Sequence, residues 1–321
     1  MIRILILSPK SIAGKLIIES FAAAFESNKC LVKIKNVEEL SAEDLDFFKP
    51  DVVFGYDYSY LMDENCTKLI EKLHCKNLFF YFADEPQSKL ALGDKTGLYE
   101  KLKKIKATIF IWDKDFIDEF ENCFYLPLAA SPFKYATNFS GYEYAITFVG
   151  RPLTIKRQKI LCELVKFFKN KVSIFCFEKH FLRSIEEIKA QNLLEEADLE
   201  TYSKCWKSFV TSEEELAKIY NSSKINLNIT EQGKSSLNYR VFEVLASGGF
   251  LITDEREDLQ ELFEDNKYIE TYKNTTDLID KIGFYLQNLN IAQKMAQIGR
   301  FKCIEKHSFN ARVKIILKQI I

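Results

Sequence analysis

The sequence predicts an α/β fold made of two Rossmann-like domains, each a parallel sheet covered by helices. Three observations favour this fold. Short runs rich in β-branched and aromatic residues alternate with amphipathic stretches of about 10–15 residues, which is the pattern of βαβ units. Several of these runs, such as 77–82, are apolar on both faces, as buried parallel strands require. The length of 321 residues suits two domains.

The first series of elements precedes residue 129. Strands are expected at 2–7, 31–35, 51–54, 77–82, 108–112 and 123–126, and helices at 14–26, 37–48, 63–73, 94–105 and 114–121. The stretch 129–144 contains Pro132, Gly141 and small polar residues without helical periodicity, so the domain boundary is expected there. We therefore assign an N-terminal acceptor-side domain to 1–138, a C-terminal donor domain to 139–307 and a last helix to 308–321, which is expected to pack back on the first domain.

The second series follows this boundary. Strands are expected at 145–149, 172–177, 207–210, 225–229, 250–253 and 268–271, and helices at 156–168, 184–191, 212–221, 239–246, 259–263, 276–288, 291–305 and 309–320. Ser212 and Glu215 form the Ser-x-x-Glu pattern of a capping box at a helix start.

Composition limits the function classes. The net charge of −1 gives no overall attraction to nucleic acid or anionic lipid. The opening apolar run is too short for a signal peptide, and no apolar run approaches the ~18 residues of a membrane span. The eight cysteines form no C-x-x-C pair and the three histidines lie far apart, so free buried thiols and no metal site are expected. We expect a cytoplasmic protein without a transmembrane segment, with peripheral attachment to the inner face of the membrane left open.

The first candidate site is the turn from the strand at 145–149 to the helix at 156–168. Gly150 ends the strand, while Arg151 and Lys156 bring positive charge to a helix start whose N–H groups have no helical partner. Ligands of parallel sheets bind beyond the carboxyl ends of the strands, so this turn suits a diphosphate. A solvated turn with ordinary surface cations explains the same residues about equally well.

The second candidate lies in 230–249, where a buried strand runs into a loop of small polar residues and then into a helix. Arg240 and Glu243 share one face of that helix, and Gly248-Gly249 is expected to end it in the left-handed conformation. The simpler interpretation is an Arg–Glu pair on the surface of an amphipathic helix. The loop, the helix start and the glycine pair within one βαβ unit favour a ligand site instead.

Residues 125–312 resemble the CgeB-like glycosyltransferases, which have the GT-B architecture and are related to the retaining glycosyltransferases with an E-x7-E motif. The motifs that carry the resemblance are Tyr125-Leu126-Pro127-Leu128-Ala129, Tyr220-Asn221-x-Ser223-Lys224-Ile225, Arg240-x-Phe242-Glu243-x-x-Ala246-x-Gly248-Gly249, Tyr268-x-x-Thr271-Tyr272 and His307-Ser308-Phe309-x-x-Arg312. The resemblance implies two Rossmann-like domains that face a cleft. It also implies transfer of a sugar from a nucleotide-diphosphate sugar to an acceptor hydroxyl.

The resemblance further implies a role for each motif. Glu243 would hold the ribose hydroxyls of the donor, and Gly150, Arg151 and Lys156 its diphosphate. The residues expected against the phosphates and the sugar are Ser235, Ser236, Asn238, Tyr239 and Arg240. The chain departs from the pattern at Ser235, where the related enzymes carry the first glutamate of E-x7-E. The contact to the donor sugar and the stereochemical outcome therefore stay open.

The partners implied are a nucleotide sugar as donor and a glycan, a lipid-linked sugar or a protein as acceptor. No nucleic acid is expected, and no cofactor beyond the donor substrate. A role in bacterial surface glycan biosynthesis would fit these partners.

A third candidate site follows the strand at 77–82. Asp84 and Glu85 are the candidates for a general base that acts on the acceptor hydroxyl. An acidic helix cap before Pro86 is the simpler interpretation of the same residues, and we favour it at this point.

Three other functions are consistent with two Rossmann-like domains. A nicotinamide or flavin enzyme is disfavoured because no G-x-G-x-x-G follows the first strand, and the P-loop pattern is also missing from the sequence. A GT-B-type sugar-nucleotide epimerase and a non-catalytic sugar-nucleotide-binding module of a glycan assembly complex remain as alternatives. Turnover of the donor in the presence of acceptor would separate the binding module from a transferase.

Overall fold

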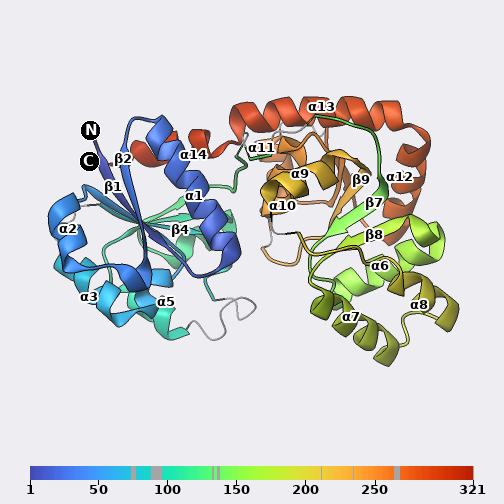
Figure 1. Cartoon of the computed structure of the whole chain (residues 1–321), viewed down its shortest axis with the longest axis horizontal. Coiled ribbons are helices and arrows are strands. Elements are labelled where there is room, and N and C mark those ends of the chain that lie inside the picture. The colour runs from blue at the N-terminus through green and yellow to red at the C-terminus, as the bar shows by residue number, and fades with distance from the viewer. Residues whose placement is uncertain are drawn as a thin grey trace. The chain divides into compact units, whose positions relative to one another are not determined.

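The structure is a computed structural model that describes residues 1–73, 77–87, 96–131, 134–135, 138–210, 212–233, 235–263 and 268–320. The chain divides into two compact units (Figure 1). Unit 1 comprises Met1–Ala129, Gln232–Ser236 and His307–Ile321, and unit 2 comprises Ala130–Glu231 and Leu237–Lys306. The domain limits expected at 138 and 307 stay predictions, and each unit is described by itself.

Unit 1 is built on a parallel sheet, which has six strands in the described part of the chain and the order β2-β1-β3-β4-β5-β6. The strands are β1 (Arg3–Ser8), β2 (Leu31–Asn36), β3 (Val52–Tyr56), β4 (Asn77–Phe82), β5 (Thr108–Ile111) and β6 (Cys123–Tyr125). The connecting helices are α1 (Ile12–Ser27), α2 (Ala42–Phe48), α3 (Glu64–Lys72) and α5 (Thr96–Lys103), with short 3₁₀ helices η1 (Val37–Glu39), η2 (Ser59–Met62) and η3 (Lys114–Glu119).

The last helix of the chain, α14 (Phe309–Leu317), completes the core of unit 1. The ring of Phe309 lies 4.9 Å from that of Phe21 on α1, which in turn contacts Phe54 on β3 at 5.0 Å. Arg312 is buried and donates to the carbonyl oxygens of Pro127 at 2.7 Å and Leu128 at 3.0 Å. The helix is therefore held both by aromatic packing and by charge-assisted hydrogen bonds.

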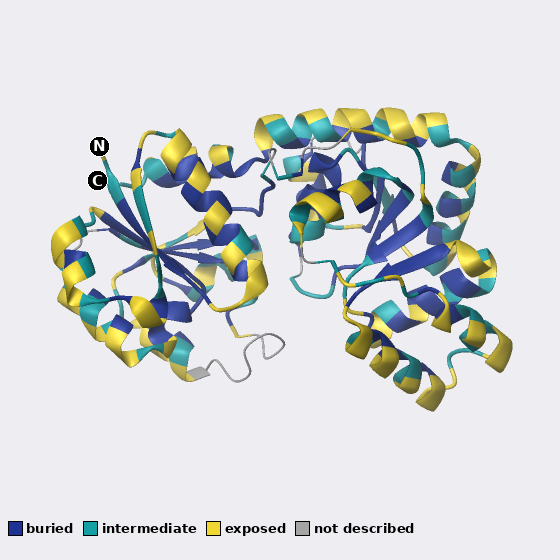
Figure 2. Cartoon of the chain, viewed as in Figure 1, coloured by how far each residue is buried: buried dark blue, intermediate teal, exposed yellow. Residues whose placement is uncertain are grey.

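Unit 2 contains a second parallel sheet, with five described strands in the order β11-β10-β9-β7-β8. The strands are β7 (Tyr144–Val149), β8 (Val172–Phe175), β9 (Ser223–Asn228), β10 (Leu251–Asp254) and β11 (Glu270–Tyr272). The helices are α6 (Ile155–Phe168), η4 (Lys169–Lys171), α7 (Glu178–Ala190), α8 (Glu196–Ser203), α9 (Glu213–Asn221), α10 (Tyr239–Ala246), α11 (Glu257–Leu262), α12 (Thr275–Gln287) and α13 (Leu289–Lys306). Figure 2 shows the strands of this sheet as buried and the outer helix faces as exposed.

The helix α10 lies inside unit 2 rather than on its surface. All residues from Val241 to Ala246 are buried. The helix ends as expected from the glycine pair, because Gly248 has the left-handed φ of 74° and its N–H bonds the carbonyl of Leu245. A Cβ on Gly249 would lie 2.7 Å from the backbone oxygen of Tyr220, so only glycine fits this close approach.

Several predicted elements were wrong or incomplete. The strand expected at 207–210 is absent, although the structure describes these residues: only an isolated bridge joins Trp206 to Ile174 on the edge strand β8, and Phe209 packs on Phe177 instead. The helix expected at 37–48 is broken before Ser41, which caps α2 together with Asp44. Residues 114–119 form a 3₁₀ helix, and α8 was not expected at all.

Candidate active site

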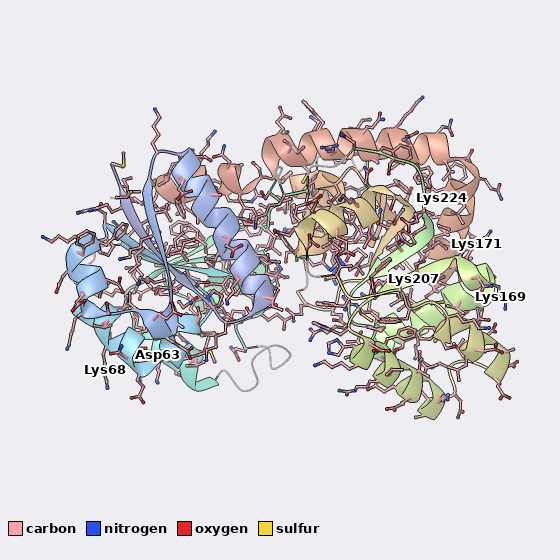
Figure 3. The ribbon with its side chains drawn as sticks, viewed as in Figure 1. Asp63, Lys68, Lys169, Lys171, Lys207 and Lys224 are labelled. Atoms are coloured by element: carbon pink, nitrogen blue, oxygen red, sulfur yellow. The ribbon has the colours of Figure 1, made fainter. Side chains whose placement is uncertain are left out.

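Three loops of unit 2 meet at the carboxyl edge of its sheet. Strand β7 is followed by Gly150, β9 leads into the loop before α10, and β10 ends at Asp254. Because β10, β9 and β7 are neighbours in the sheet, residues after these strands lie close together. This is the edge at which parallel sheets bind ligands. Figure 3 labels Lys171 and Lys224, which lie before or at the start of their strands and hence at the opposite edge.

The turn after β7 requires glycine and carries an exposed cation. Gly150 has a φ of 151°, and its N–H donates to the carbonyl of Phe175 at 3.0 Å. Arg151 follows and is exposed. Thr154 caps α6 by accepting from the N–H of Arg157 at 3.4 Å. The turn therefore places the start of α6 next to the long, exposed cationic side chain of Arg151. A diphosphate site needs both features.

Arg157 holds this turn to the end of β9. Its Nε and Nη2 donate to the carbonyl of Ile229 at 3.1 and 2.8 Å, and Nη1 donates to the carbonyl of Arg151 at 3.0 Å. The guanidinium also lies 2.8 Å from the carboxylate of Glu231 and is only 12% exposed. Burial lowers the pKa of Arg157 to about 10, with Glu231 acting in the opposite direction. Arg157 is thus a positioning residue for the Gly150 turn.

Lys156 is tied to β10. Its Nζ lies 2.9 Å from Asp254 Oδ2 and 2.9 Å from the carbonyl oxygen of Thr230. Asp254 Oδ1 in turn accepts from both the N–H and the hydroxyl of Thr230, at 3.1 and 2.8 Å. An ammonium group has three donors, and the Lys156 side chain is 45% exposed. Lys156 therefore has a further donor for an anion while its position is fixed.

Glu243 on α10 is buried among hydrogen-bond donors. Its Oε1 accepts from the hydroxyl of Tyr135 at 2.7 Å, and its Oε2 from the hydroxyl of Tyr220 at 3.3 Å and Nε of Arg240 at 3.3 Å. Arg240 also donates to the carbonyl oxygen of Val149. The carboxylate side chain is 7% exposed, so the interpretation of Arg240 and Glu243 as a surface ion pair was wrong. Burial and the nearby Glu243 raise the pKa of Tyr135 well above its usual value, so this phenol remains a hydrogen-bond donor.

The start of α10 carries the next two predicted residues. Asn238 is the N-cap residue, and its Nδ2 donates to Asn228 Oδ1 at 2.9 Å. Its own Oδ1 is buried and has no hydrogen-bond partner among the residues that the structure describes. Such a buried acceptor is costly unless a ligand or water satisfies it. Tyr239 follows as the first residue of the helix and is half-buried.

Ser235 and Ser236 lie in the segment 232–236, which packs with unit 1. The Ser235 hydroxyl donates to Asp115 Oδ2 at 2.8 Å, and the N–H of Gly233 donates to Glu85 Oε1 at 2.9 Å. A Cβ on Gly233 would lie 2.4 Å from Asp113 Oδ2. Glu85 of unit 1 therefore contacts the segment that carries Ser235 and Ser236, whereas the other predicted donor residues lie in unit 2.

Several residues of these sites were not predicted. Tyr135 and Tyr220 surround Glu243, and Asp254 anchors Lys156. Asp113 and Asp115 form an Asp-x-Asp pair that follows β5, a signal that could have been read from the sequence. They contact the same segment as Glu85.

An aromatic pair stands at the carboxyl end of β8. The rings of Phe177 and Phe209 stack with centroids 3.4 Å apart, and both are more than one third exposed. His180 lies beside Phe177, and burial, followed by the charges of Lys179 and Arg151, lowers its pKa. Exposed aromatic faces next to the Gly150 turn can stack with a planar ring.

Two features are absent from the described residues. No group of three or more His, Cys, Asp or Glu side chains could hold a metal ion in the ranges that the structure describes. Within the same ranges, no helix combines the length and the apolar character needed to span a bilayer.

Comparisons with known proteins agree with this geometry. Residues 179–318 match a family described as Glycosyl transferase-like. No curated protein matches the sequence. Among solved structures, a glycosyltransferase from Rickettsia africae is 14% identical, with a TM-score of 0.67 over 99% of this chain and 97% of that chain.

Two further structures were determined with UDP. An α-glucosyltransferase in complex with UDP and a 13-mer DNA is 13% identical, with a TM-score of 0.75 over 99% of both chains. The Anabaena protein HepE in complex with UDP is 9% identical, with a TM-score of 0.68 over 100% of this chain and 99% of that chain. The predicted α/β architecture of two Rossmann-like domains is confirmed, and it is that of GT-B proteins. The family match covers residues 179–318, and the solved structures agree with this chain in fold.

Proposed function

We propose that this chain transfers a sugar from a nucleoside diphosphate sugar to an acceptor hydroxyl, and that unit 2 holds the donor. The donor site is inferred from the surroundings of Glu243, a buried carboxylate on α10. Hydrogen bonds from Tyr135, Tyr220 and Arg240 fix both of its oxygens. A carboxylate of fixed geometry can accept both hydroxyls of a ribose. In this proposal Lys156, Arg151 and the start of α6 hold the diphosphate, and Phe177 and Phe209 offer an aromatic face to the base.

The catalytic side of the proposal lies in unit 1. We assign the general base to Asp84 and a positioning role to Glu85, whose carboxylate accepts the N–H of Gly233. Glu85, Asp115 and Ser235 then hold the segment 232–236 in place. The reaction as proposed uses the nucleotide sugar without a further cofactor or metal.

The finer parts of the proposal rest on sequence motifs. The CgeB-like signature around Arg240 and Glu243 supports that subgroup of the GT-B glycosyltransferases. It also supports an acceptor that is a glycan, a lipid-linked sugar or a protein of a surface-glycan pathway. We propose a cytoplasmic location with peripheral attachment to the membrane.

The function is tested first by ligand binding. Titration calorimetry with UDP, GDP, dTDP and ADP is expected to identify one nucleotide that binds, and its sugar conjugate is expected to bind as well. At 100 times its dissociation constant, that ligand is expected to stabilise the fold by about 2.7 kcal/mol in a thermal unfolding experiment. Incubation of this donor with candidate acceptors should then release free nucleoside diphosphate. If the donor binds but no acceptor leads to release of nucleoside diphosphate, the result would favour the non-catalytic binding module.

The roles of Asp84 and Glu85 can be separated by matched amide substitutions. Glu85→Gln is expected to keep the transfer rate within about threefold, because an amide oxygen still accepts the Gly233 N–H. Glu85→Ala removes this acceptor and is expected to raise KM for the donor about tenfold, as for the loss of one buried hydrogen bond. Asp84→Asn is expected to lower kcat by about a hundredfold or more. If instead Glu85→Gln alone lowers kcat this far, the base is Glu85.

A further inference from the structure

The carboxylate of Glu231, in the loop that follows β9, has a partner on only one of its two oxygens. Oε2 lies 2.8 Å from Nη1 of Arg157, and the Glu231 side chain is 15% exposed. Oε1 is buried, and no group in the described part of the chain donates a hydrogen bond to it. A buried acceptor without a donor costs free energy. The packing of unit 2 therefore does not explain why a carboxylate stands at this position.

Glu231 lies at the part of the sheet edge that is proposed to hold the diphosphate. Nη1 of Arg157 donates to Glu231 and also, at 3.0 Å, to the carbonyl oxygen of Arg151 in the turn after β7. The carbonyl oxygen of the preceding residue, Thr230, accepts from Nζ of Lys156 at 2.9 Å. All five residues belong to unit 2. The carboxylate is thus held beside the cations assigned to the diphosphate.

The chemistry of this oxygen limits what can bind to it. A carboxylate oxygen only accepts hydrogen bonds, and the ionised phosphates of a nucleotide sugar also only accept, so they cannot satisfy Oε1 of Glu231. The charge of Arg157 offsets that of the carboxylate, which therefore does not repel the phosphates as an unpaired one would.

The hydrogen-bond donors of a nucleotide sugar are groups of the base, the ribose hydroxyls and the hydroxyls of the sugar. In the proposed function Glu243 binds the ribose, and the aromatic pair of Phe177 and Phe209 faces the base. The hydroxyls of the sugar are the donors that remain, and they are attached next to the diphosphate.

We propose that Oε1 of Glu231 accepts a hydrogen bond from a hydroxyl of the sugar that is transferred. Glu231 then distinguishes a nucleotide sugar from the free nucleoside diphosphate, whereas Glu243 binds a part that both ligands share. It also selects among sugars, because a sugar without this hydroxyl leaves the buried acceptor unsatisfied. The inference rests on the proposed function in one respect, since it takes a nucleotide sugar as the ligand of unit 2.

The test is titration calorimetry with UDP, GDP, dTDP and ADP, and with the glucose, galactose, mannose and N-acetylglucosamine conjugates of the one that binds. The measured quantity is the affinity for the best conjugate divided by the affinity for the free diphosphate. Glu231→Gln is expected to lower this ratio about tenfold or more, as for the loss of a hydrogen bond to a charged group. The affinity for the free diphosphate is expected to stay within about threefold, because the amide oxygen still accepts from Arg157.

The matched control is Glu270→Gln, at the start of β11 and hence at the opposite edge of the same sheet. Glu270 is also a partly buried carboxylate, but both of its oxygens have partners. Oε1 lies 3.1 Å from Nζ of Lys281, and Oε2 accepts from the hydroxyl of Tyr285. This variant is expected to bind every ligand like the parent. If Glu231→Gln loses affinity equally for the free diphosphate and the conjugate, Glu231 has only a structural role and the inference is wrong, while the proposed function stands.

Analogues of the best conjugate that each lack one sugar hydroxyl identify the contact. The analogue without the recognised hydroxyl is expected to bind the parent about tenfold or more weakly. It is expected to bind Glu231→Gln within about twofold of the complete conjugate, because the contact is already lost. If every analogue loses as much affinity in this variant as in the parent, no sugar hydroxyl contacts Glu231 and the inference is overturned. A parent that binds neither the diphosphates nor the conjugates would contradict the proposed function itself, and the inference with it.

Discussion

Glu243→Gln is expected to weaken the binding of free nucleotide and of nucleotide sugar alike, by roughly ten- to a hundredfold, as for the loss of hydrogen bonds to a charged group. Both oxygens of the carboxylate accept hydrogen bonds, whereas an amide replaces one of them with an NH₂ donor. In one orientation this NH₂ group would face the Tyr135 hydroxyl, and in the other it would face the donors of Tyr220 and Arg240. Titration calorimetry with free nucleotide and full donor measures the effect. Equal losses for both ligands identify the ribose as the group recognised.

The control for Glu243 is Tyr135→Phe. It removes the hydroxyl that donates to Oε1 at 2.7 Å and keeps the carboxylate. Since this hydroxyl occupies the same acceptor that a ribose hydroxyl would use, nucleotide affinity is expected to stay equal or to rise. Stability is expected to fall by about 1 kcal/mol for one lost hydrogen bond. If Glu243→Gln binds free nucleotide as tightly as the parent, the ribose assignment is wrong.

Arg157→Ala is expected to lower the free energy of unfolding by about 3–5 kcal/mol, which is typical when one partner of a buried ion pair is removed. The substitution leaves the carbonyl of Ile229 without two donated hydrogen bonds and the carboxylate of Glu231 without its cation. The Gly150 turn and the end of β9 lose their connection, so donor binding is expected to disappear as well. Urea unfolding followed by circular dichroism measures the first effect.

Two further substitutions on α6 serve as controls for the change in the free energy of unfolding. Arg157→Lys keeps the charge but not the planar set of donors, so an intermediate loss is expected. Lys159→Ala removes an exposed cation from the same helix and is expected to change the free energy of unfolding by less than about 0.5 kcal/mol. An Arg157→Ala protein as stable as the Lys159→Ala protein would contradict the positioning role.

The sequence was most informative where periodicity and burial agree. The strand at 77–82 and the helix at 239–246 have the predicted limits, because continuous apolar residues and a glycine pair define them locally. The strand predicted at 207–210 was wrong, since a short segment beside an edge strand can pack its side chains without forming a ladder of backbone hydrogen bonds. The contacts of the candidate site could not be predicted either. Tyr135 and Glu243 are 108 residues apart, and Glu85 and Gly233 are 148 apart.

The position of α14 has a consequence for the order in which the two units fold during synthesis. The core of unit 1 includes Phe309 and the hydrogen bonds of Arg312, yet all its strands precede Ala129. At ~5–20 residues per second, a ribosome needs roughly ten to forty seconds to pass from the end of these strands to the last helix. During this interval the nascent sheet exposes the apolar side of α1 around Phe21. The first half of the chain is therefore the part that chaperones are most expected to protect, and the second unit can finish folding before the first.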